Sequence, residues 1–278
     1  MRHRSLTAAV LVNVVAWAAV LVVVFPLIWM IVTSVKPQFE LFRIPPTFLP
    51  GEVTLEHYAR VLTETPFLRY FRNSAVIAVS TTVLVIVVAT LGAYSLVRFS
   101  YRGRERLALM VLFTYLLPSV VLIIPLYLML VKIGVANSIL SLVIAYTTFA
   151  LPFALWLLRS FMKGIPPDLE AAALVDGASR MEAFVDVILP QALPGIISTA
   201  LFTFILAWNE YLYALVLVNS DTVRPLTTGV MSMLVTSFNI EWSLLMAASV
   251  MMSVPVIIVF ALMQKQLTRG FGAGGVKG

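Results

Sequence analysis

Residues Ile165–Pro190, with the sequence IPPDLEAAALVDGASRMEAFVDVILP, decide how the chain is organised, because they interrupt its long apolar runs with charge, proline and glycine. The two prolines near the start of the segment prevent an upstream helix from continuing, and Gly177 can adopt the left-handed conformation that ends a helix. Asp168 can accept a backbone N–H as an N-cap. We therefore predict a first short helix over residues 169–176.

The second half of the segment carries the signals for another helix. Ser179 and Glu182 stand three residues apart, the spacing of a capping box in which each side chain bonds the other's backbone amide. Pro190 is expected to end the helix that follows, which places it over residues 180–189. The pattern predicts two short helices joined by a tight turn, and an amphipathic loop lying on the lipid surface is the alternative.

Outside this segment the sequence is typical of an integral membrane protein. Of its 278 residues, 61% are hydrophobic and 12% are charged, which is unlike an ordinary soluble domain. A helix needs about 20 mostly apolar residues to cross the hydrocarbon core. The runs that satisfy this are residues 11–32, 75–97, 107–131, 139–158, 196–218 and 244–263. We predict a single all-α domain over residues 1–278 with six transmembrane helices, the first being too long for the apolar core of a signal peptide.

Lysine and arginine fall mainly on one face of this six-span topology, and basic loops are retained in the cytoplasm. The residues concerned are Arg2, Arg4, Arg98, Arg102, Arg104, Arg106, Arg159, Lys163, Arg180, Lys265, Arg269 and Lys277. Both termini and the loop over residues 159–194 are therefore predicted to be cytoplasmic, and the loop over residues 36–72 external. The net charge of +6 is explained by membrane orientation, so no nucleic-acid partner is expected.

The sequence offers little support for catalytic or metal chemistry. The chain has no cysteine, and its two histidines, His3 and His57, are too far apart to suggest a metal pair. None of its lysines follows a glycine, as the phosphate-binding loop of an ATPase requires. We therefore expect no catalytic residue, no metal and no cofactor bound by this chain, and an energy source on another polypeptide.

The fifth apolar run contains polar and aromatic side chains, which are costly in lipid unless they face a cavity or a partner. They are Trp208, Asn209, Glu210 and Tyr211. Such a mixture can hydrogen-bond hydroxyl groups and stack on sugar rings, so these residues are candidates for a substrate pathway. The alternative is that Glu210 binds a backbone or side-chain donor on a neighbouring helix and serves packing alone.

Two motifs and the C-terminal tail carry a resemblance to a known family. Residues 170–172 (EAA), Gly177 and residues 188–190 (ILP) resemble the EAA loop of membrane subunits of bacterial binding-protein-dependent ABC importers. Residues 207–211 (AWNEY) are similar to the corresponding element of carbohydrate importers. The basic, Gly-rich tail over residues 269–278 resembles that of the second membrane subunit of maltose transporters.

The resemblance implies a type I ABC importer permease fold with cytoplasmic EAA coupling helices. It further implies that the loop seats in a groove of a cytoplasmic ATPase, where Glu170 would pair with a basic group and Gly177 would permit the sharp turn. The matching coupling residues are Glu170, Ala171, Ala172, Asp176 and Gly177.

The partners implied by the resemblance are two ATPase subunits that carry ATP and Mg, a second and different permease subunit, and an external substrate-binding protein. The implied cargo is a carbohydrate, such as a disaccharide, an oligosaccharide or a related polyol, which crosses the bacterial cytoplasmic membrane. An ion-coupled secondary carrier is the alternative function. Carriers commonly contain internal repeats and ion sites of their own, and we detect neither a repeat nor paired membrane carboxylates in the sequence.

Overall fold

The computed structural model describes residues 6–236 and 239–272 and is almost entirely helical. It divides into two compact units, one formed by Met1–Leu68 with Val230–Val254 and the other by Arg69–Gly229 with Pro255–Gly278. Helices α11 (Leu226–Leu234) and α12 (Trp242–Gly272) each have residues in both units. The single transmembrane domain stays a prediction. The tail residues Gly275–Gly278 and the orienting residues Arg2 and Arg4 lie outside the described part of the chain.

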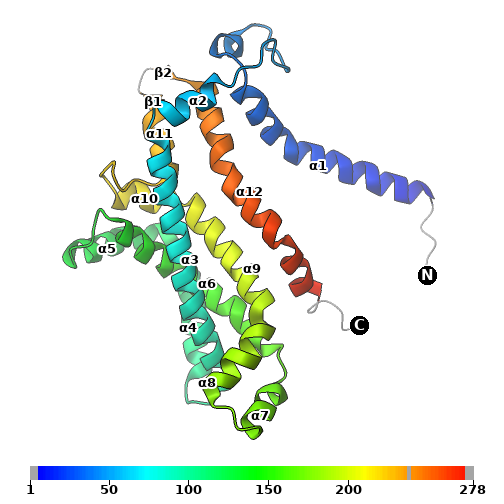
Figure 1. Ribbon diagram of the computed structural model, residues 1–278, viewed down its shortest axis with the longest axis vertical. Helices are drawn as coiled ribbons and strands as arrows, with labels where there is room; N and C mark the ends of the chain where they lie inside the picture. The colour runs from blue at the N-terminus through cyan, green and yellow to red at the C-terminus, as the bar shows by residue number, and fades with distance from the viewer. Residues whose placement is uncertain (1–5, 237–238, 273–278) are drawn as a thin grey trace. The chain divides into compact units, whose positions relative to one another are not determined.

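The core of the second unit lies among three long helices, α3 (Phe67–Arg98), α6 (Ile139–Lys163) and α9 (Leu189–Asn209), labelled in Figure 1. Small residues let the helices approach closely, as is common in membrane bundles. Those of the buried cluster are Ala89, Ala93, Ala150, Ala154 and Ala192. At Gly195 an added Cβ would lie 2.5 Å from the ring of Phe161, so only glycine fits this crossing of α9 and α6.

Two of the predicted spans are interrupted in the structure. The third, over residues 107–131, is wrong as one continuous helix: α4 (Arg104–Tyr115) and α5 (Ser119–Lys132) meet at a bend of 98° (Figure 1). Pro118 explains the break, because a proline ring disfavours helical geometry in the residue before it and removes a backbone donor. The fifth, over residues 196–218, is also interrupted, with α9 ending at Asn209 and the short α10 (Leu212–Leu217) following.

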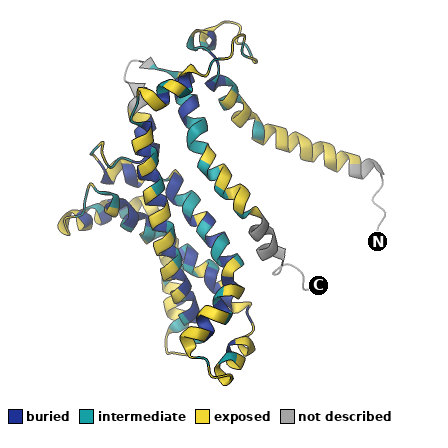
Figure 2. Ribbon diagram, viewed as in Figure 1, coloured by how far each residue is buried: buried dark blue, intermediate teal, exposed yellow. Residues whose placement is uncertain are grey.

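The first unit contains α1 (Leu6–Ser34), the 3-10 helix η1 (Gln38–Phe42), α2 (Glu56–Thr63) and the start of α12. A short antiparallel pair, β1 (Val235–Thr236) and β2 (Asn239–Ile240), precedes α12, with Val235 opposite Ile240. Figure 2 shows that the apolar side chains of α1 are exposed along most of the helix, as expected of a surface that lipid or another subunit covers.

Charged groups inside the first unit hold the loop that follows α1. Lys36 is only 1% exposed and donates its Nζ hydrogens to the carbonyl oxygen of Thr47. Glu40 accepts from the backbone N–H of Gly51 at 2.8 Å and from the hydroxyl of Thr47 at 2.9 Å. The Gly51 bond lowers the pKa of Glu40, which keeps the carboxylate charged as an acceptor. The predicted external loop is therefore a folded element rather than a flexible connection.

Among the residues that the structure describes, five helical runs are long and apolar enough to cross a membrane, and the bent pair of α4 and α5 makes six if it counts as one span. Helices α1, α3, α6 and α12 cover the first, second, fourth and sixth predicted spans, and their crossing of the membrane stays a prediction. The helical run that corresponds to the fifth predicted span is Arg180–Asn209, which begins well before residue 196, where that span was predicted to start.

Candidate functional site

The segment that dominates the sequence forms a helix, a sharp turn and a second helix at one end of the second unit (Figure 1). Helix α7 (Pro167–Val175) ends in a Schellman motif: the N–H of Ala178 donates to the carbonyl of Ala173 at 3.0 Å, and that of Gly177 to Leu174 at 3.2 Å. Gly177 has a φ of +95°, so its predicted left-handed conformation is confirmed. A side chain there would be strained, because L-residues rarely adopt this conformation.

The start of α7 differs from the prediction. Asp168 was expected to be the N-cap, but the cap is Pro166, and no side chain bonds the first amides. Pro167 takes the first helical position, where its missing N–H costs nothing and its fixed φ suits the helix. Asp168 therefore lies within the first turn, where a carboxylate still interacts favourably with the positive end of the helix.

The second helix begins as predicted and then continues much further. Helix α8 (Arg180–Glu182) has a complete capping box, in which Glu182 accepts from the N–H of Ser179 at 2.7 Å and Ser179 accepts from that of Glu182 at 3.3 Å. A π-helix, η2 (Ala183–Ile188), follows and leads directly into α9. The prediction that Pro190 ends this helix is wrong. A π-helix has a wider turn, which relieves the clash between a proline ring and the carbonyl four residues before it.

Glu170 turns inward, toward its own chain. Its side chain is buried, with the residue 6% exposed, and accepts a hydrogen bond from the hydroxyl of Tyr94 at 2.6 Å. Its other oxygen lies 3.0 Å from Nε of Arg98. The expectation that Glu170 presents its carboxylate to a basic group on another subunit is therefore wrong for this structure, because Arg98 already supplies the opposite charge.

Further contacts bind the α7 region to the end of α3. Arg98 also donates from Nη2 to the carbonyl oxygen of Ile165 at 3.0 Å, just before α7 begins. The ring of Phe184, on the π-helix, lies 4.6 Å from that of Tyr94. The sequence did not connect Tyr94 and Arg98 with Glu170, although their spacing of four places both on one face of a helix. We call Tyr94, Arg98 and Glu170 the anchor cluster.

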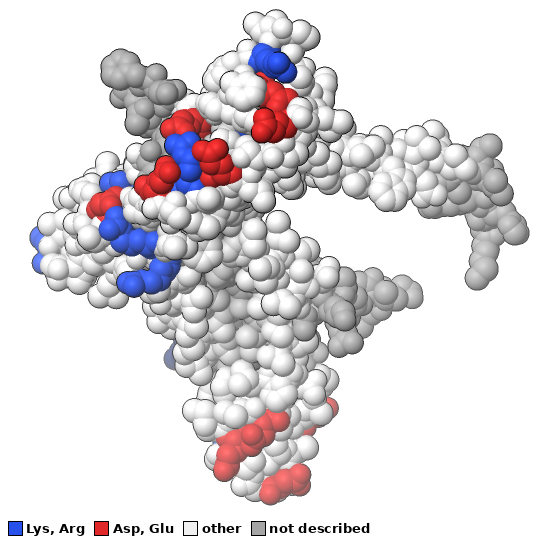
Figure 3. Space-filling view, turned by 45° about the horizontal axis from the view of Figure 1, so that its top comes forward, with Lys and Arg blue, Asp and Glu red and all other residues white. Residues whose placement is uncertain are grey.

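With Glu170 facing inward, small and apolar residues face outward. Ala171 and Ala172 are exposed, and Val175 is 86% exposed, which is unusual for an apolar side chain in a polar loop. We call these three residues the outer face of α7. Figure 3 shows acidic side chains at the lower end of the molecule, where α7 lies in Figure 1. Those that are exposed are Asp168, Asp176, Glu182 and Asp186.

The second candidate site lies where α9 stops. Glu210 interrupts the helix with an extended backbone (ψ 132°), and its side chain accepts from the N–H groups of Tyr213 at 2.9 Å and Ala214 at 3.1 Å. These are otherwise unpaired amides at the start of α10, so Glu210 satisfies a helix end inside an apolar region. Of the two roles considered for Glu210, binding a backbone donor is the one observed, and the donors lie on the next helix of the chain.

The neighbours of Glu210 differ in how accessible they are. Trp208 is 2% exposed and is packed against Phe71, with ring centroids 5.5 Å apart, and Phe204, at 5.6 Å. Asn209 is exposed and Tyr211 is half-buried. The structure therefore brings the four pathway candidates to one helix break and buries only Trp208, whereas Asn209 is exposed and Glu210, like Tyr211, is half-buried. No three potential metal ligands come together among the residues that the structure describes.

Apolar helices of membrane-spanning length, with a polar helix–turn–helix loop at one end, are typical of a multi-pass membrane subunit. The chain belongs to the family described as "Binding-protein-dependent transport system inner membrane component", whose model matches residues 85–272. It is thus a permease subunit of an ABC transporter in the inner membrane, and not itself an enzyme. Membership decides against the ion-coupled secondary carrier.

Individual relatives match over nearly their whole length. The diacetylchitobiose uptake system permease protein DasC of Streptomyces coelicolor is 34% identical, covering 99% of both chains. The trehalose/maltose transport system permease protein MalG of Thermococcus litoralis is 35% identical, covering 93% of both. A solved bacterial ABC transporter involved in the import of the acidic polysaccharide alginate contains a chain that is 25% identical, with a TM-score of 0.83, covering 95% of this chain and 98% of that one.

The anchor cluster predicts a strong coupling between two substitutions. Arg98→Met or Glu170→Leu alone should each destabilise the protein by about 3 kcal/mol, because each leaves one charge buried without its partner. The double variant should cost less than either single one. Denaturant unfolding of the detergent-solubilised protein measures this cycle. Arg60→Met is the control: this arginine pairs with Glu64 and Glu241 at the surface, and its loss should cost less than about 1 kcal/mol. If the destabilisation of the double variant equals the sum of the two single values, Arg98 and Glu170 do not stabilise each other, which would contradict the anchor cluster.

Proposed function

We propose that this permease subunit takes part in the ATP-driven import of a carbohydrate, such as a disaccharide, an oligosaccharide or a related polyol. The names of its relatives support this cargo class, since they refer to diacetylchitobiose, trehalose and maltose, and sulfoquinovosyl glycerol. The exposed asparagine and half-buried tyrosine at the break after α9 have the chemistry to bind hydroxyl groups and sugar rings.

The coupling of transport to ATP hydrolysis is proposed to pass through the loop that contains α7. The observation that carries this proposal is the outer face of α7, where Ala171, Ala172 and Val175 are exposed together. Two small side chains allow another protein's backbone to approach, and an exposed valine gains free energy when a partner covers it. Asp176 is the C-cap of α7, and Gly177 forms the turn that follows it.

A complete transporter would need partners that this chain does not contain. They are two cytoplasmic ATPase subunits that bind ATP and Mg, a second permease subunit and an external substrate-binding protein. A solved alginate ABC transporter in complex with a pentasaccharide-bound periplasmic protein shares the fold, with a TM-score of 0.69 at 15% identity. In our proposal both termini are cytoplasmic, and closure of the ATPases moves the α7 loop and switches the permease between inward and outward openings.

Crosslinking from the outer face of α7 tests the coupling role. The chain has no native cysteine, so Ala172→Cys provides a single attachment point for a photoactivated maleimide reagent. In the purified transporter complex we expect an adduct with an ATPase subunit, detected by mass spectrometry. Val22→Cys is the control, because Val22 is also exposed, at 74%, but lies in α1, within a candidate membrane span. Adducts of Ala172→Cys with lipid alone would overturn the coupling proposal.

The turn offers a second test of coupling. Gly177→Val should cost about 1–2 kcal/mol locally, because valine is strained at a positive φ. We expect the variant to insert and assemble with its partners but to lose most of the transport that ATP hydrolysis drives, measured as uptake per ATP hydrolysed in proteoliposomes. Gly177→Asn is the matched control, since asparagine tolerates the left-handed conformation and should retain coupling. Normal coupling in the valine variant would show that the turn is not needed.

The pathway proposal is tested at the accessible residues beside the helix break. Asn209→Ala and Tyr211→Ala should each reduce uptake of the transported sugar about tenfold, the effect of losing one well-formed hydrogen bond or stacking contact. The basal ATPase rate of the complex should not change. The transported sugar is identified beforehand by measuring the uptake of labelled maltose, trehalose and diacetylchitobiose by the parent complex. Asn219→Ala, at another exposed asparagine, is the control, and unchanged uptake in both pathway variants would exclude them as cargo contacts.

A further inference from the structure

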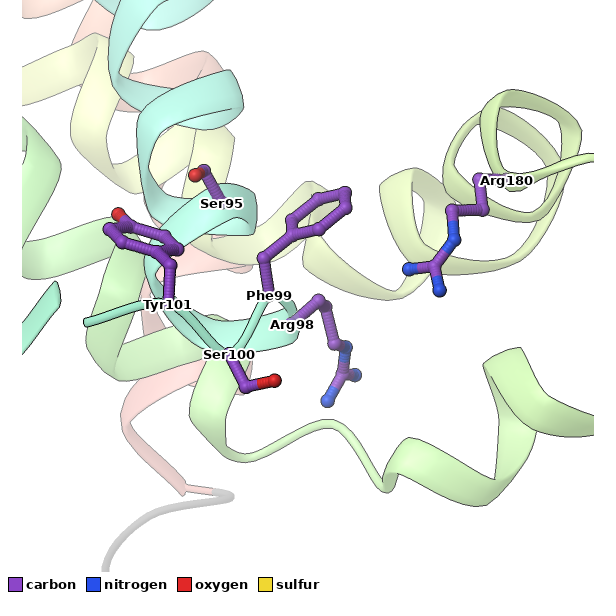
Figure 4. Close-up of a pocket in the computed structure, with 6 residues that line it drawn as sticks. All are labelled: Ser95, Arg98, Phe99, Ser100, Tyr101 and Arg180. Carbon is purple, nitrogen blue, oxygen red and sulfur yellow. The ribbon is translucent and has the colours of Figure 1, made fainter.

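A polar pocket lies beside the anchor cluster, between the end of α3 and the start of α8. It has a volume of about 480 Å³, within the range of small-molecule sites. Figure 4 shows Arg180 reaching from α8 toward Phe99 and Arg98 at the end of α3. The lining residues are Ser95, Arg98, Phe99, Ser100, Tyr101 and Arg180.

The lining is suited to a single negative charge. Arg98 and Arg180 both contribute guanidinium groups, but the charge of Arg98 is balanced by Glu170, so the pocket keeps about one unit of positive charge. In the part of the chain that the structure describes, Arg180 forms no ion pair and instead lies 5.2 Å from the ring centroid of Phe99. Guanidinium groups bind phosphate oxygens well because their donors match the spacing of those oxygens.

Hydroxyl groups complete the set of donors. Ser95 is half-buried, Ser100 and Tyr101 are exposed, and none of their three hydroxyl groups makes a hydrogen bond within the described ranges, 6–236 and 239–272. A half-buried hydroxyl without a partner loses hydrogen bonds to water that it does not regain in the protein. A ligand with several acceptor oxygens would satisfy these groups.

The position of the pocket points to the membrane surface. Ser95 and Arg98 belong to the last turn of α3, where the candidate span Phe67–Arg98 ends. Tyr101 also lines a neighbouring hollow of about 530 Å³, with Arg102, Arg104, Glu105 and Arg106 among its other residues. The result is a mainly basic strip at the end of a span, where phospholipid headgroups lie and where basic residues attract anionic lipids.

We propose that this pocket binds a phosphate group, supplied by the headgroup of an anionic phospholipid. The guanidinium of Arg180 would hold the phosphate oxygens, and the hydroxyls of Ser95 and Ser100 would donate to them. This site is separate from the outer face of α7, since Ala171, Ala172 and Val175 do not line it. The proposal therefore does not depend on how the loop meets an ATPase.

Native mass spectrometry of the delipidated transporter complex tests the proposal. Phosphatidylglycerol is titrated onto the parent complex and onto complexes with Arg180→Gln or Ser100→Ala. We expect Arg180→Gln to weaken lipid binding about tenfold, which is the loss of one charge-assisted contact, and Ser100→Ala to weaken it less. Lys163→Gln is the control, because this exposed lysine stands at the end of α6 but does not line the pocket, and its lipid binding should match that of the parent.

A parallel titration with inorganic phosphate separates the two sources of the ligand. If inorganic phosphate displaces the lipid only at concentrations far above that of the lipid, the result supports the lipid headgroup as the ligand. Tight binding of phosphate in the absence of lipid would assign the site to free phosphate and overturn the lipid source. Equal lipid binding by the parent and Arg180→Gln would overturn the site. The site would also be overturned if the Arg180→Gln complex kept its lipid but lost its ATPase subunits, because the arginine would then serve a contact between proteins.

Discussion

The burial of one carboxylate determines how the polar loop is held. A buried Glu170 without a partner would cost several kcal/mol, and the cost is offset only because Arg98 and Tyr94 reach it from the end of α3. The loop cannot move away from α3 without separating these groups. The orientation of α7 follows from this contact, because turning Glu170 inward places Ala171 and Ala172 on the exposed side.

Features that depend on neighbouring residues could be predicted from the sequence. Gly177 takes its positive φ, and Ser179 and Glu182 form their capping box, because each depends on backbone geometry within a few residues. Most of the apolar spans could also be located, since hydrocarbon imposes a minimum length on any helix that crosses it. Local chemistry therefore accounts for the helix–turn–helix loop and for most of the crossings.

Features that depend on distant residues were predicted wrongly or not at all. Glu170 precedes three alanines in a short helix, and nothing nearby in the sequence shows that Arg98, 72 residues earlier (170 − 98 = 72), lies within 3.0 Å of it. Pro190 is a helix breaker by its own chemistry, but the π-helix before it accommodates the ring. The sequence does not reveal the helix break at Glu210. The amides that its side chain caps, those of Tyr213 and Ala214, would be hydrogen-bonded within the helix if the helix were continuous.

The helical run that contains the π-helix joins two sites that are far apart. Arg180–Asn209 comprises 30 residues without a cap between them, which corresponds to about 45 Å of helix. In the proposed coupling, a force applied at the turn before Arg180 would act on one end of a lever whose other end is Asn209, at the helix break. A tilt of about 5° about one end of such a rod displaces the other by about 4 Å, on the order of one helical turn. Under that proposal, a movement of the loop would reach the helix break at Asn209 through the continuous helical run alone.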